Sequence, residues 1–373
     1  LCLFYQWMMT TKPKYLYLHV PFCRTICSYC DFCHVGYQEK IANQWLDAIK
    51  ADIQNRHINE NLLTIYIGGG TPTALSSSQL DELLSLLDPY ARMAQEYTIE
   101  INPETFDEDK AKILQKHGVN RASIGFQTSD EKLLQMMNRH HRLEDVAKTM
   151  RRLRKYGIDN ISLDLMYSLP TQTMESLEKS VQDAIALEPT HLSLYSLTIE
   201  PNTVFAKKGY EHLEDDMEAD MYEWICKMLP KYGFVQYEIS NFAKGDMISM
   251  HNCAYWNYQD FYGIGCGASG LEGSTRYDIP KNVRKYIEDS SIKDTIDLSL
   301  QDQMFEAVMM GLRLKEGMYI HLFEERFHTS VLEVYSTQIK KLCNEGKLIL
   351  EKNRLRCSEE GFEILNSILL EFM

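Results

Sequence analysis

The chain has 373 residues, of which 45% are hydrophobic and 25% are charged, the proportions of an ordinary globular protein. Its 39 basic and 53 acidic side chains give a formal net charge of −14. This balance argues against nucleic acid as the main partner, because binding to a phosphate backbone needs clustered lysine and arginine. The length fits one large domain followed by a smaller one.

Residues 1–14 are expected to form an N-terminal extension outside the fold. The apolar segment 1–9 is too short to span a bilayer and lacks the basic flank of a signal peptide. Because the chain begins with Leu1, the natural start is sought at Met8 or Met9, and the extension is taken as disordered or mis-started. Ten cysteines without a secretory signal are typical of a reducing, cytoplasmic location and of metal binding.

The first predicted strand, residues 15–20, leads into a cysteine cluster. The cysteines with the spacing C-x₃-C-x₂-C are Cys23, Cys27 and Cys30. Thiolates at this spacing can hold an iron–sulfur cluster, and three ligands leave one iron of a [4Fe–4S] cube open to a small molecule. The alternatives are a zinc site completed by Cys33 or His34, and three buried structural cysteines.

Short apolar runs alternate with amphipathic helical patterns as far as residue 202. The six predicted strands are residues 15–20, 63–67, 97–101, 122–126, 161–166 and 191–197. Helical spacing of apolar residues predicts intervening helices, one capped by Ser77 or Ser78 and another by Thr173. Six such units imply a parallel sheet covered by helices, either doubly wound or curled into a partial barrel.

Polar and glycine residues gather at the carboxyl ends of these strands, where barrels of this type carry their chemistry. They are the run Gly68 to Pro72, which includes Gly69, Gly70 and Thr71, and then Glu100, Gln127 and Asp164. Each is an ordinary rim residue when taken alone. Together with Arg139 they offer what a zwitterionic nucleoside requires: carboxylates for ribose hydroxyls or an ammonium, and a guanidinium for a carboxylate.

Beyond residue 202 the pattern changes. The predicted elements are a helix over 215–232 with Met217 on its inner face, a strand over 236–242, an aromatic glycine-rich run over 251–270, a hairpin of 348–350 with 355–357, and a helix over 362–370. The tail resembles a winged helix, and its excess of acids favours a packing or partner module over a DNA reader. We therefore divide the chain into a core at 15–240, a second region at 241–298 and a C-terminal domain at 299–373.

Several motifs resemble those of the radical S-adenosylmethionine (SAM) superfamily. They are Tyr17 to Cys23, Cys30 to Phe32, Gly68 to Pro72, Ile99 to Pro103, Ser123 to Gln127, and Asp164 to Pro170. More narrowly, the chain resembles the oxygen-independent coproporphyrinogen III oxidase family and its heme-chaperone (HemW) branch. This resemblance implies a partial (β/α)₆ barrel with a C-terminal extension and a small winged-helix-like α+β domain.

The same resemblance implies a [4Fe–4S] cluster on the three cysteines, with SAM bound to the open iron. The SAM site it implies consists of Tyr17, Gly69, Gly70, Thr71, Glu100, Gln127, Arg139 and Asp164, with Tyr29 near the adenine. Such a cluster receives its electron from a donor such as flavodoxin or ferredoxin. The cofactors supply the difficult chemistry, while the protein positions them and excludes water.

Two features favour the heme-chaperone branch over the oxidase. Phe32 stands where the oxidase carries a further cysteine, and His251 to Trp256 fits the pattern H-N-x-x-Y-W. The branch implies heme as a ligand, respiratory heme proteins as acceptors, and at most peripheral membrane contact. His251 is then either an axial ligand of heme iron or a hydrogen-bonded structural residue.

The remaining reading from a different class is an enzyme that decarboxylates coproporphyrinogen III oxidatively in porphyrin biosynthesis. The chain also departs from the family pattern at three positions, one of which is Ile26, where the family often has a basic residue. Ser168 stands where the family usually has glycine, and Ser269 replaces a histidine of the usual G-A-H-G.

Overall fold

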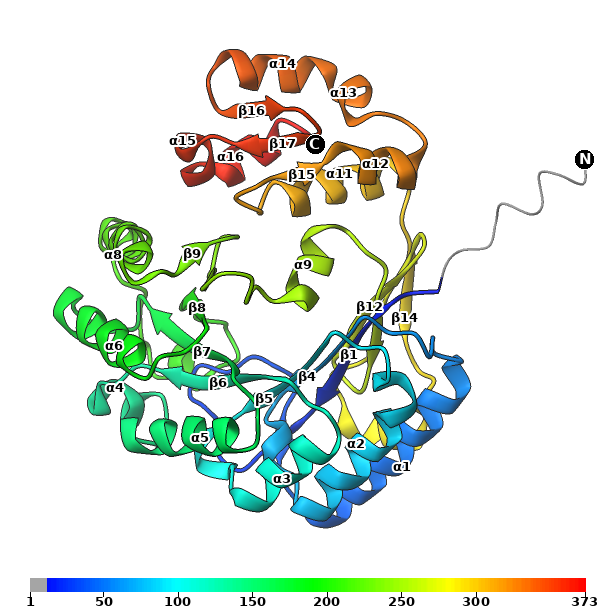
Figure 1. The fold of residues 1–373 in the computed structure, drawn as a ribbon, viewed down its shortest axis with the longest axis vertical. Helices are drawn as coiled ribbons and strands as arrows, with labels where there is room; N and C mark the ends of the chain where they lie inside the picture. The colour runs from blue at the N-terminus through cyan, green and yellow to red at the C-terminus, as the bar shows by residue number, and fades with distance from the viewer. Residues whose placement is uncertain (1–11) are drawn as a thin grey trace, which may run out of the picture.

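The computed structural model describes residues 12–373 (Figure 1). Most of the extension predicted for residues 1–14 therefore lies outside the described residues. Within residues 12–373, no helix is both long and apolar enough to cross a bilayer.

One nine-stranded sheet organises the molecule, with the strand order β11-β1-β4-β5-β6-β7-β8-β10-β9. The six predicted strands are present as β1 (Tyr15–Val20), β4 (Thr64–Gly69), β5 (Glu96–Ile101), β6 (Arg121–Gln127), β7 (Asn160–Tyr167) and β8 (His191–Ser196). They run parallel to one another, and β11 (Tyr262–Ile264) joins the outer side of β1 in the same direction. Because strands adjacent in space follow chain order and the sheet stays open between β11 and β9, the prediction of a partial barrel is confirmed.

Helices cover the outer side of this sheet (Figure 1). They are α1 (Glu39–Arg56), α2 (Ser77–Ala91), α3 (Glu108–Lys116), α4 (Glu131–Met136), α5 (Leu143–Lys155) and α6 (Met174–Ala186). Alternate residues of each strand therefore pack against these helices. In β1 they are Leu16, Leu18 and Val20, which are fully buried in the main core. Residues of opposite parity face the inside of the barrel, where polar side chains predominate.

The predicted helix caps are partly confirmed. Thr173 caps α6, its hydroxyl accepting a hydrogen bond from the backbone N–H of Ser176. The cap of α2 is Ser76, not Ser77 or Ser78, because Ser76 and Gln79 each accept the other's backbone N–H. This reciprocal arrangement satisfies two donors at once, which the neighbouring serines cannot do from inside the helix.

Two predictions after residue 202 are wrong in detail. The strand predicted over 236–242 is two short antiparallel strands, β9 (Val235–Gln236) and β10 (Asn241–Ala243). The predicted helix over 215–232 is α8 (Asp215–Met228) followed by a 3₁₀ turn, Leu229–Tyr232. Met217 on α8 is 40% exposed, whereas Met221 is fully buried, so the inward face is narrower than the methionine pattern indicated.

The rest of the chain extends the barrel and builds a second core. Its elements are α7 (Val204–Lys207), α9 (Met250–Trp256), β12 (Ser269–Glu272), β13 (Thr275–Asp278), α10 (Val283–Glu288), β14 (Asp294–Asp297), α11 (Leu300–Gly311), β15 (Met318–Tyr319), α12 (Ile320–Phe327), α13 (Val331–Val334), α14 (Ser336–Asn344), β16 (Leu348–Glu351), β17 (Arg354–Cys357), α15 (Glu359–Glu363) and α16 (Leu365–Leu370). The predicted hairpin is β16 and β17, while the predicted last helix is divided into α15 and α16. Helix α9 lies between the main sheet and the C-terminal domain (Figure 1).

Candidate functional site

The cysteine loop is closed at its base by two short parallel strands, β2 (Phe22–Cys23) and β3 (Val35–Gly36). Its middle is anchored to the body of the protein by backbone bonds. The N–H of Ser28 donates to Met137 O at 2.9 Å, and Ser28 O accepts from the N–H of Phe205 at 3.0 Å. The loop is therefore held on both sides, although it contains no helix or strand of its own.

The three thiols lie in this loop at different depths. Cys23 is 7% exposed and accepts a hydrogen bond from the Thr71 hydroxyl at 3.7 Å. Burial raises the pKa of Cys23 to about 12, and it also raises the pKa values of Cys27 and Cys30. His34 Nδ1 lies 3.6 Å from Cys30 Sγ. All three thiols are thus protonated in the metal-free protein, so a metal must displace their protons to bind.

The glycine run at the end of β4 permits a close approach of its backbone to β1. A Cβ on Gly69, whose φ is +111°, would lie 2.5 Å from the ring of His19, so no other residue fits there. The His19 ring is itself fixed, because its Nδ1 accepts a hydrogen bond from the Tyr17 hydroxyl at 3.0 Å. Gly70 N–H donates to Val20 O at 2.8 Å, which joins the run to the end of β1.

Glu100 lies directly beside the glycine run. Its carboxylate accepts hydrogen bonds from the N–H of Gly69 at 2.9 Å and from the Tyr66 hydroxyl at 3.0 Å. A Cβ on Gly68 would come within 2.7 Å of Glu100 Oε1. Burial, and after it the charge of Asp164, raise the pKa of Glu100 to about 7.

Gln127 and Arg139 meet over β6. A Cβ on Gly125 would lie 3.0 Å from Gln127 Nε2 and 3.1 Å from Arg139 Nη1. Gln127 itself has φ +60°, an uncommon conformation that clusters at functional sites. Arg139 donates to the Tyr29 hydroxyl at 3.3 Å, but its buried Nε has no hydrogen-bond partner among residues 12–373. This unused donor points to a missing acceptor.

Asp164 completes the group of predicted residues, and a neighbour was missed. Its carboxylate accepts from the Ser123 hydroxyl at 2.9 Å and from the Ser162 hydroxyl at 3.3 Å, and burial raises its pKa. Tyr195 on β8 lies near Asp164, which together with burial raises the pKa of the phenol. The Tyr195 residue is 42% exposed. The polar residues alternating along β8 were the signal that could have found it.

Comparison with known proteins agrees with this geometry. The chain matches the Radical SAM superfamily over residues 17–184 and the HemN C-terminal domain over residues 298–364. It is 37% identical to the protein named heme chaperone HemW of Lactococcus lactis, over 98% of each chain. It is 33% identical to the HemW of Escherichia coli, over 98% of this chain and 100% of the relative.

The chain belongs to the HemW family of radical SAM proteins. Its fold is similar to that of coproporphyrinogen III oxidase (HemN) from Escherichia coli, with a TM-score of 0.84, 22% identity, and coverage of 99% of this chain and 92% of that one. At that identity the likeness concerns the fold. The fold class predicted from the sequence is confirmed, and family membership implies a [4Fe–4S] cluster and SAM.

The three thiols of the cysteine loop suit the [4Fe–4S] cluster that family membership implies. Among residues 12–373, no three His, Cys, Asp or Glu side chains converge on one metal ion. A mononuclear zinc site needs four ligands at about 2.0–2.3 Å from the metal, whereas a cube of four irons spreads its cysteines further apart. Cys23, Cys27 and Cys30 are near enough to one another that the charge of each of the other two raises the pKa of Cys23.

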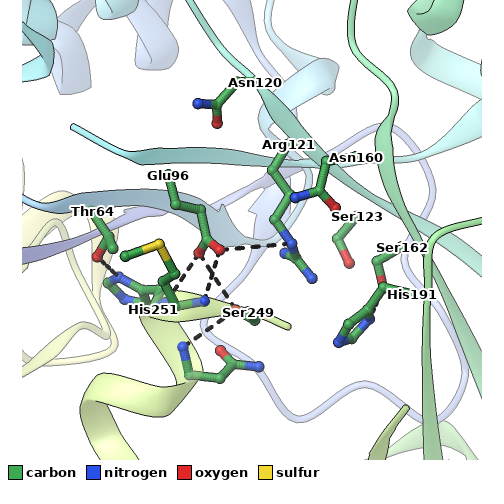
Figure 2. Close-up of polar contacts among 12 residues, drawn as sticks. Thr64, Glu96, Asn120, Arg121, Ser123, Asn160, Ser162, His191, Ser249 and His251 are labelled. Atoms are coloured by element: carbon green, nitrogen blue, oxygen red, sulfur yellow. Dashed lines mark hydrogen bonds and ion pairs between the residues drawn. The ribbon is translucent and has the colours of Figure 1, made fainter. Parts of the chain in front are cut away.

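The H-N-x-x-Y-W motif of the HemW family lies at the other end of the barrel. The first residues of β4 to β8 form a polar cluster there, buried except for the partly exposed Asn160, and they are Thr64, Glu96, Arg121, Asn160 and His191 (Figure 2). Glu96 accepts from the N–H of Met250 at 2.8 Å and of His251 at 3.0 Å, so it caps the first turn of α9. Glu96 and Glu100 are four residues apart on one strand, about 13 Å. The motif helix therefore closes the amino end of the barrel, opposite the cysteine loop.

His251 uses both ring nitrogens in this position. Nδ1 is 2.6 Å from the Thr64 hydroxyl, and Nε2 is 2.8 Å from the Tyr255 hydroxyl. The residue is 1% exposed, and burial lowers its pKa to about 3. Neither nitrogen is free to bind iron in this geometry, so the contacts favour the structural reading of His251 over the axial-ligand reading.

The last residue of the motif has different surroundings. Trp256 lines a cavity of about 300 Å³ between α9 and the C-terminal domain, together with Met318, Phe323 and Phe327. Its buried indole N–H has no hydrogen-bond partner among residues 12–373. The two ends of the motif thus face separate sites, one sealed and one open.

Two of the departures from the family pattern, Ser168 and Ser269, have local explanations. Ser168 adopts φ +58°, the conformation that glycine favours, and its hydroxyl donates to Glu218 at 2.8 Å. That hydrogen bond offsets part of the backbone strain. Ser269 donates to the Asp278 carboxylate across the hairpin of β12 and β13, where it is exposed.

Proposed function

We propose that this protein is a heme chaperone, which binds heme alongside a [4Fe–4S] cluster and SAM and passes the heme to respiratory heme proteins. The observation that carries the proposal is the identity of 31–37% to bacterial proteins named heme chaperone HemW over 98% of the chain. Phe32 and the complete H-N-x-x-Y-W sequence support it.

The proposed cluster ligands are Cys23, Cys27 and Cys30. The proposed SAM contacts are Tyr17, Tyr29, Gly69, Gly70, Thr71, Glu100, Gln127, Arg139 and Asp164. When bound, the cluster supplies an electron to the sulfonium cofactor, and a flavodoxin-like or ferredoxin-like donor is the proposed source of that electron.

The charges of the barrel interior suit a cationic cofactor. Glu100 and Asp164 are both half-buried acids with raised pKa values, and within residues 12–373 no basic side chain is hydrogen-bonded to either. A sulfonium nearby would favour their ionised forms. The unpartnered Nε of Arg139 would receive the carboxylate of the same ligand.

SAM affinity is expected to rise with pH up to about 7. With the pKa of Glu100 at about 7, the group is largely protonated at pH 6. Binding a cation then releases a proton, so the dissociation constant should fall by up to about tenfold per pH unit below that pKa and level off above it. Isothermal titration of the reconstituted protein between pH 6 and 8 checks this. Glu100→Gln should flatten the profile, and an equally steep profile in that variant would assign the proton to another group.

For heme, we expect His251→Ala to leave binding in place. Both ring nitrogens of His251 are hydrogen-bonded inside the protein, whereas Trp256 borders an open cavity. Heme titration followed by visible absorbance is expected to give a dissociation constant within about threefold of wild type for His251→Ala, and a weaker one for Trp256→Ala. A lost or shifted heme band in His251→Ala, with thermal unfolding unchanged, would restore the axial-ligand assignment.

Two assays separate the proposal from its alternative, an oxygen-independent coproporphyrinogen III oxidase. Reconstituted protein is given coproporphyrinogen III, SAM and a reductant under anaerobic conditions, and separately it is loaded with heme and mixed with a heme-free respiratory acceptor. We expect no protoporphyrinogen and a transfer of heme. Multiple-turnover formation of protoporphyrinogen would establish the oxidase instead.

A further inference from the structure

Two cysteines outside the proposed cluster site pack against each other. Cys33 follows the cysteine loop just before β3, and Cys266 lies in the turn between β11 and β12. Each thiol is the largest single influence on the pKa of the other, which places the two side chains next to each other, and neither cysteine is in a disulfide. A Cβ added to Gly267, the next residue along, would lie 2.4 Å from Cys33 Cβ and 3.2 Å from its Sγ. The turn therefore rests directly on Cys33.

The backbone around both thiols is fixed. Cys33 O accepts a hydrogen bond from His19 Nε2 at 2.8 Å, and a Cβ on Gly265 would lie 2.5 Å from His19 O. The turn is closed by a hydrogen bond from the N–H of Gly267 to Ile279 O at 2.9 Å. Two thiols held in contact on rigid segments need little movement to reach the geometry of a disulfide.

We propose that Cys33 and Cys266 form a reversible disulfide when a hydroperoxide oxidises the protein. The Cys33 thiolate attacks one oxygen of hydrogen peroxide, an S–O bond forms, the O–O bond breaks, and the leaving hydroxide takes up a proton as water. Cys266 then attacks the resulting sulfenic acid, the S–S bond forms, and a second water leaves. The two thiols lose two electrons and two protons, and the peroxide is reduced to two waters.

The order of attack follows from the surroundings of each thiol. The neighbouring Cys266 is the largest influence on the pKa of Cys33 and lowers it, and His19 lowers it further, whereas Cys33 and burial both raise the pKa of Cys266. Cys33 also retains 6% exposure, whereas Cys266 has none. Cys33 is thus the thiol that a small oxidant reaches first, and Cys266 is the resolving partner.

The disulfide would add a covalent link between two segments that are far apart in the sequence. It would tie the end of the cysteine loop to the turn after β11 without consuming a proposed cluster ligand. His19 donates a hydrogen bond to Cys33 O, and the ring of the same histidine is the group that a Cβ on Gly69 would meet. An oxidised protein that has lost its iron would therefore keep the loop in place for reassembly.

Peptide mapping tests this directly, because a protease that cleaves before aspartate isolates each cysteine. Asp31 and Asp47 bound a peptide, residues 31–46, that contains Cys33 alone, and residues 260–277 contain Cys266 alone. Holoprotein is treated with a small excess of hydrogen peroxide, quenched in acid, alkylated after denaturation and digested without reductant. We expect a cross-linked pair of these two peptides, lighter by two hydrogens than their sum and separated by dithiothreitol.

Variants fix the assignment. Cys266→Ser should abolish the cross-link and leave Cys33 trapped by a sulfenic-acid reagent, while Cys343→Ser in the C-terminal domain should leave it unchanged. Recovery of Cys33 and Cys266 as alkylated thiols after peroxide has bleached the cluster would overturn the proposal. A cross-link from Cys33 to Cys23, Cys27 or Cys30 would overturn it equally. Both of these outcomes are read from peptide maps of the wild-type protein, so neither depends on whether a variant folds.

Discussion

Cys23→Ala is expected to leave the protein without an iron–sulfur cluster. The variant removes one of three thiolates, and Thr71, the one side chain of residues 12–373 that is hydrogen-bonded to Cys23, carries a hydroxyl and no thiol. Reconstituted wild type should contain about four irons and four sulfides per chain, with a broad brown absorbance. Cys23→Ala should contain less than a tenth of that iron and show no spectral response to SAM.

Cys30→Ala offers a graded comparison. His34 Nδ1 lies 3.6 Å from Cys30 Sγ, so an imidazole stands near enough to replace the thiolate in part. We expect Cys30→Ala to keep some cluster and the double variant Cys30→Ala/His34→Ala to lose it. Cys343→Ala is the matched control, a part-buried cysteine in the C-terminal domain, and it should match wild type. Full iron content in Cys23→Ala would disprove the proposed ligand set.

Cluster assembly should also depend on pH in a stated direction. Burial raises the pKa values of all three thiols, that of Cys23 to about 12, so metal binding must release their protons. The rate of anaerobic reconstitution should therefore increase from pH 7 to pH 9 in wild type.

The parallel strands could be predicted from the sequence because each carries an uninterrupted apolar face toward a helix. In β1 the outward residues Leu16, Leu18 and Val20 are fully buried, and such runs are recognised without knowing what lies across the sheet. The rim residues Glu100 and Asp164 were found for a similar reason, since carboxylates at the carboxyl ends of parallel strands fall on one edge.

The inner face was harder to predict, because its residues depend on partners far along the chain. Glu96 contacts α9 more than 150 positions later, and only the fold brings them together. Two roles of His251 remain open from the sequence for the same reason: the motif shows its neighbours along the chain, but not Thr64, whose hydroxyl lies 2.6 Å from its Nδ1. The division of residues 236–242 into two strands likewise depends on pairing with β8.

Glu96→Ala is expected to destabilise the protein by about 3–5 kcal/mol, the cost of leaving a buried charge without its partner. The carboxylate is 3% exposed, lies 4.0 Å from the Arg121 guanidinium, and satisfies two backbone N–H groups of α9 (Figure 2). Its loss leaves the Arg121 charge uncompensated and two backbone donors of α9 unpaired. The control is Glu108→Ala, which removes a carboxylate from a solvent-exposed ion pair with Lys155. The free energy of unfolding of this control should equal that of wild type.

A double-mutant cycle separates the charge from the cap. Arg121→Met alone leaves Glu96 buried without a cation, but the carboxylate still accepts both N–H groups, so this variant should cost less than Glu96→Ala. The double variant lacks both charges. The sum of the destabilisations of the two single variants should therefore exceed the destabilisation of the double variant by about 1–2 kcal/mol. Urea unfolding measures each free energy, and hydrogen exchange of the α9 amides reports the cap. If the costs are additive and α9 stays protected in Glu96→Ala, the motif helix is held by its packing alone, and the polar cluster at the amino end of the barrel does not position it.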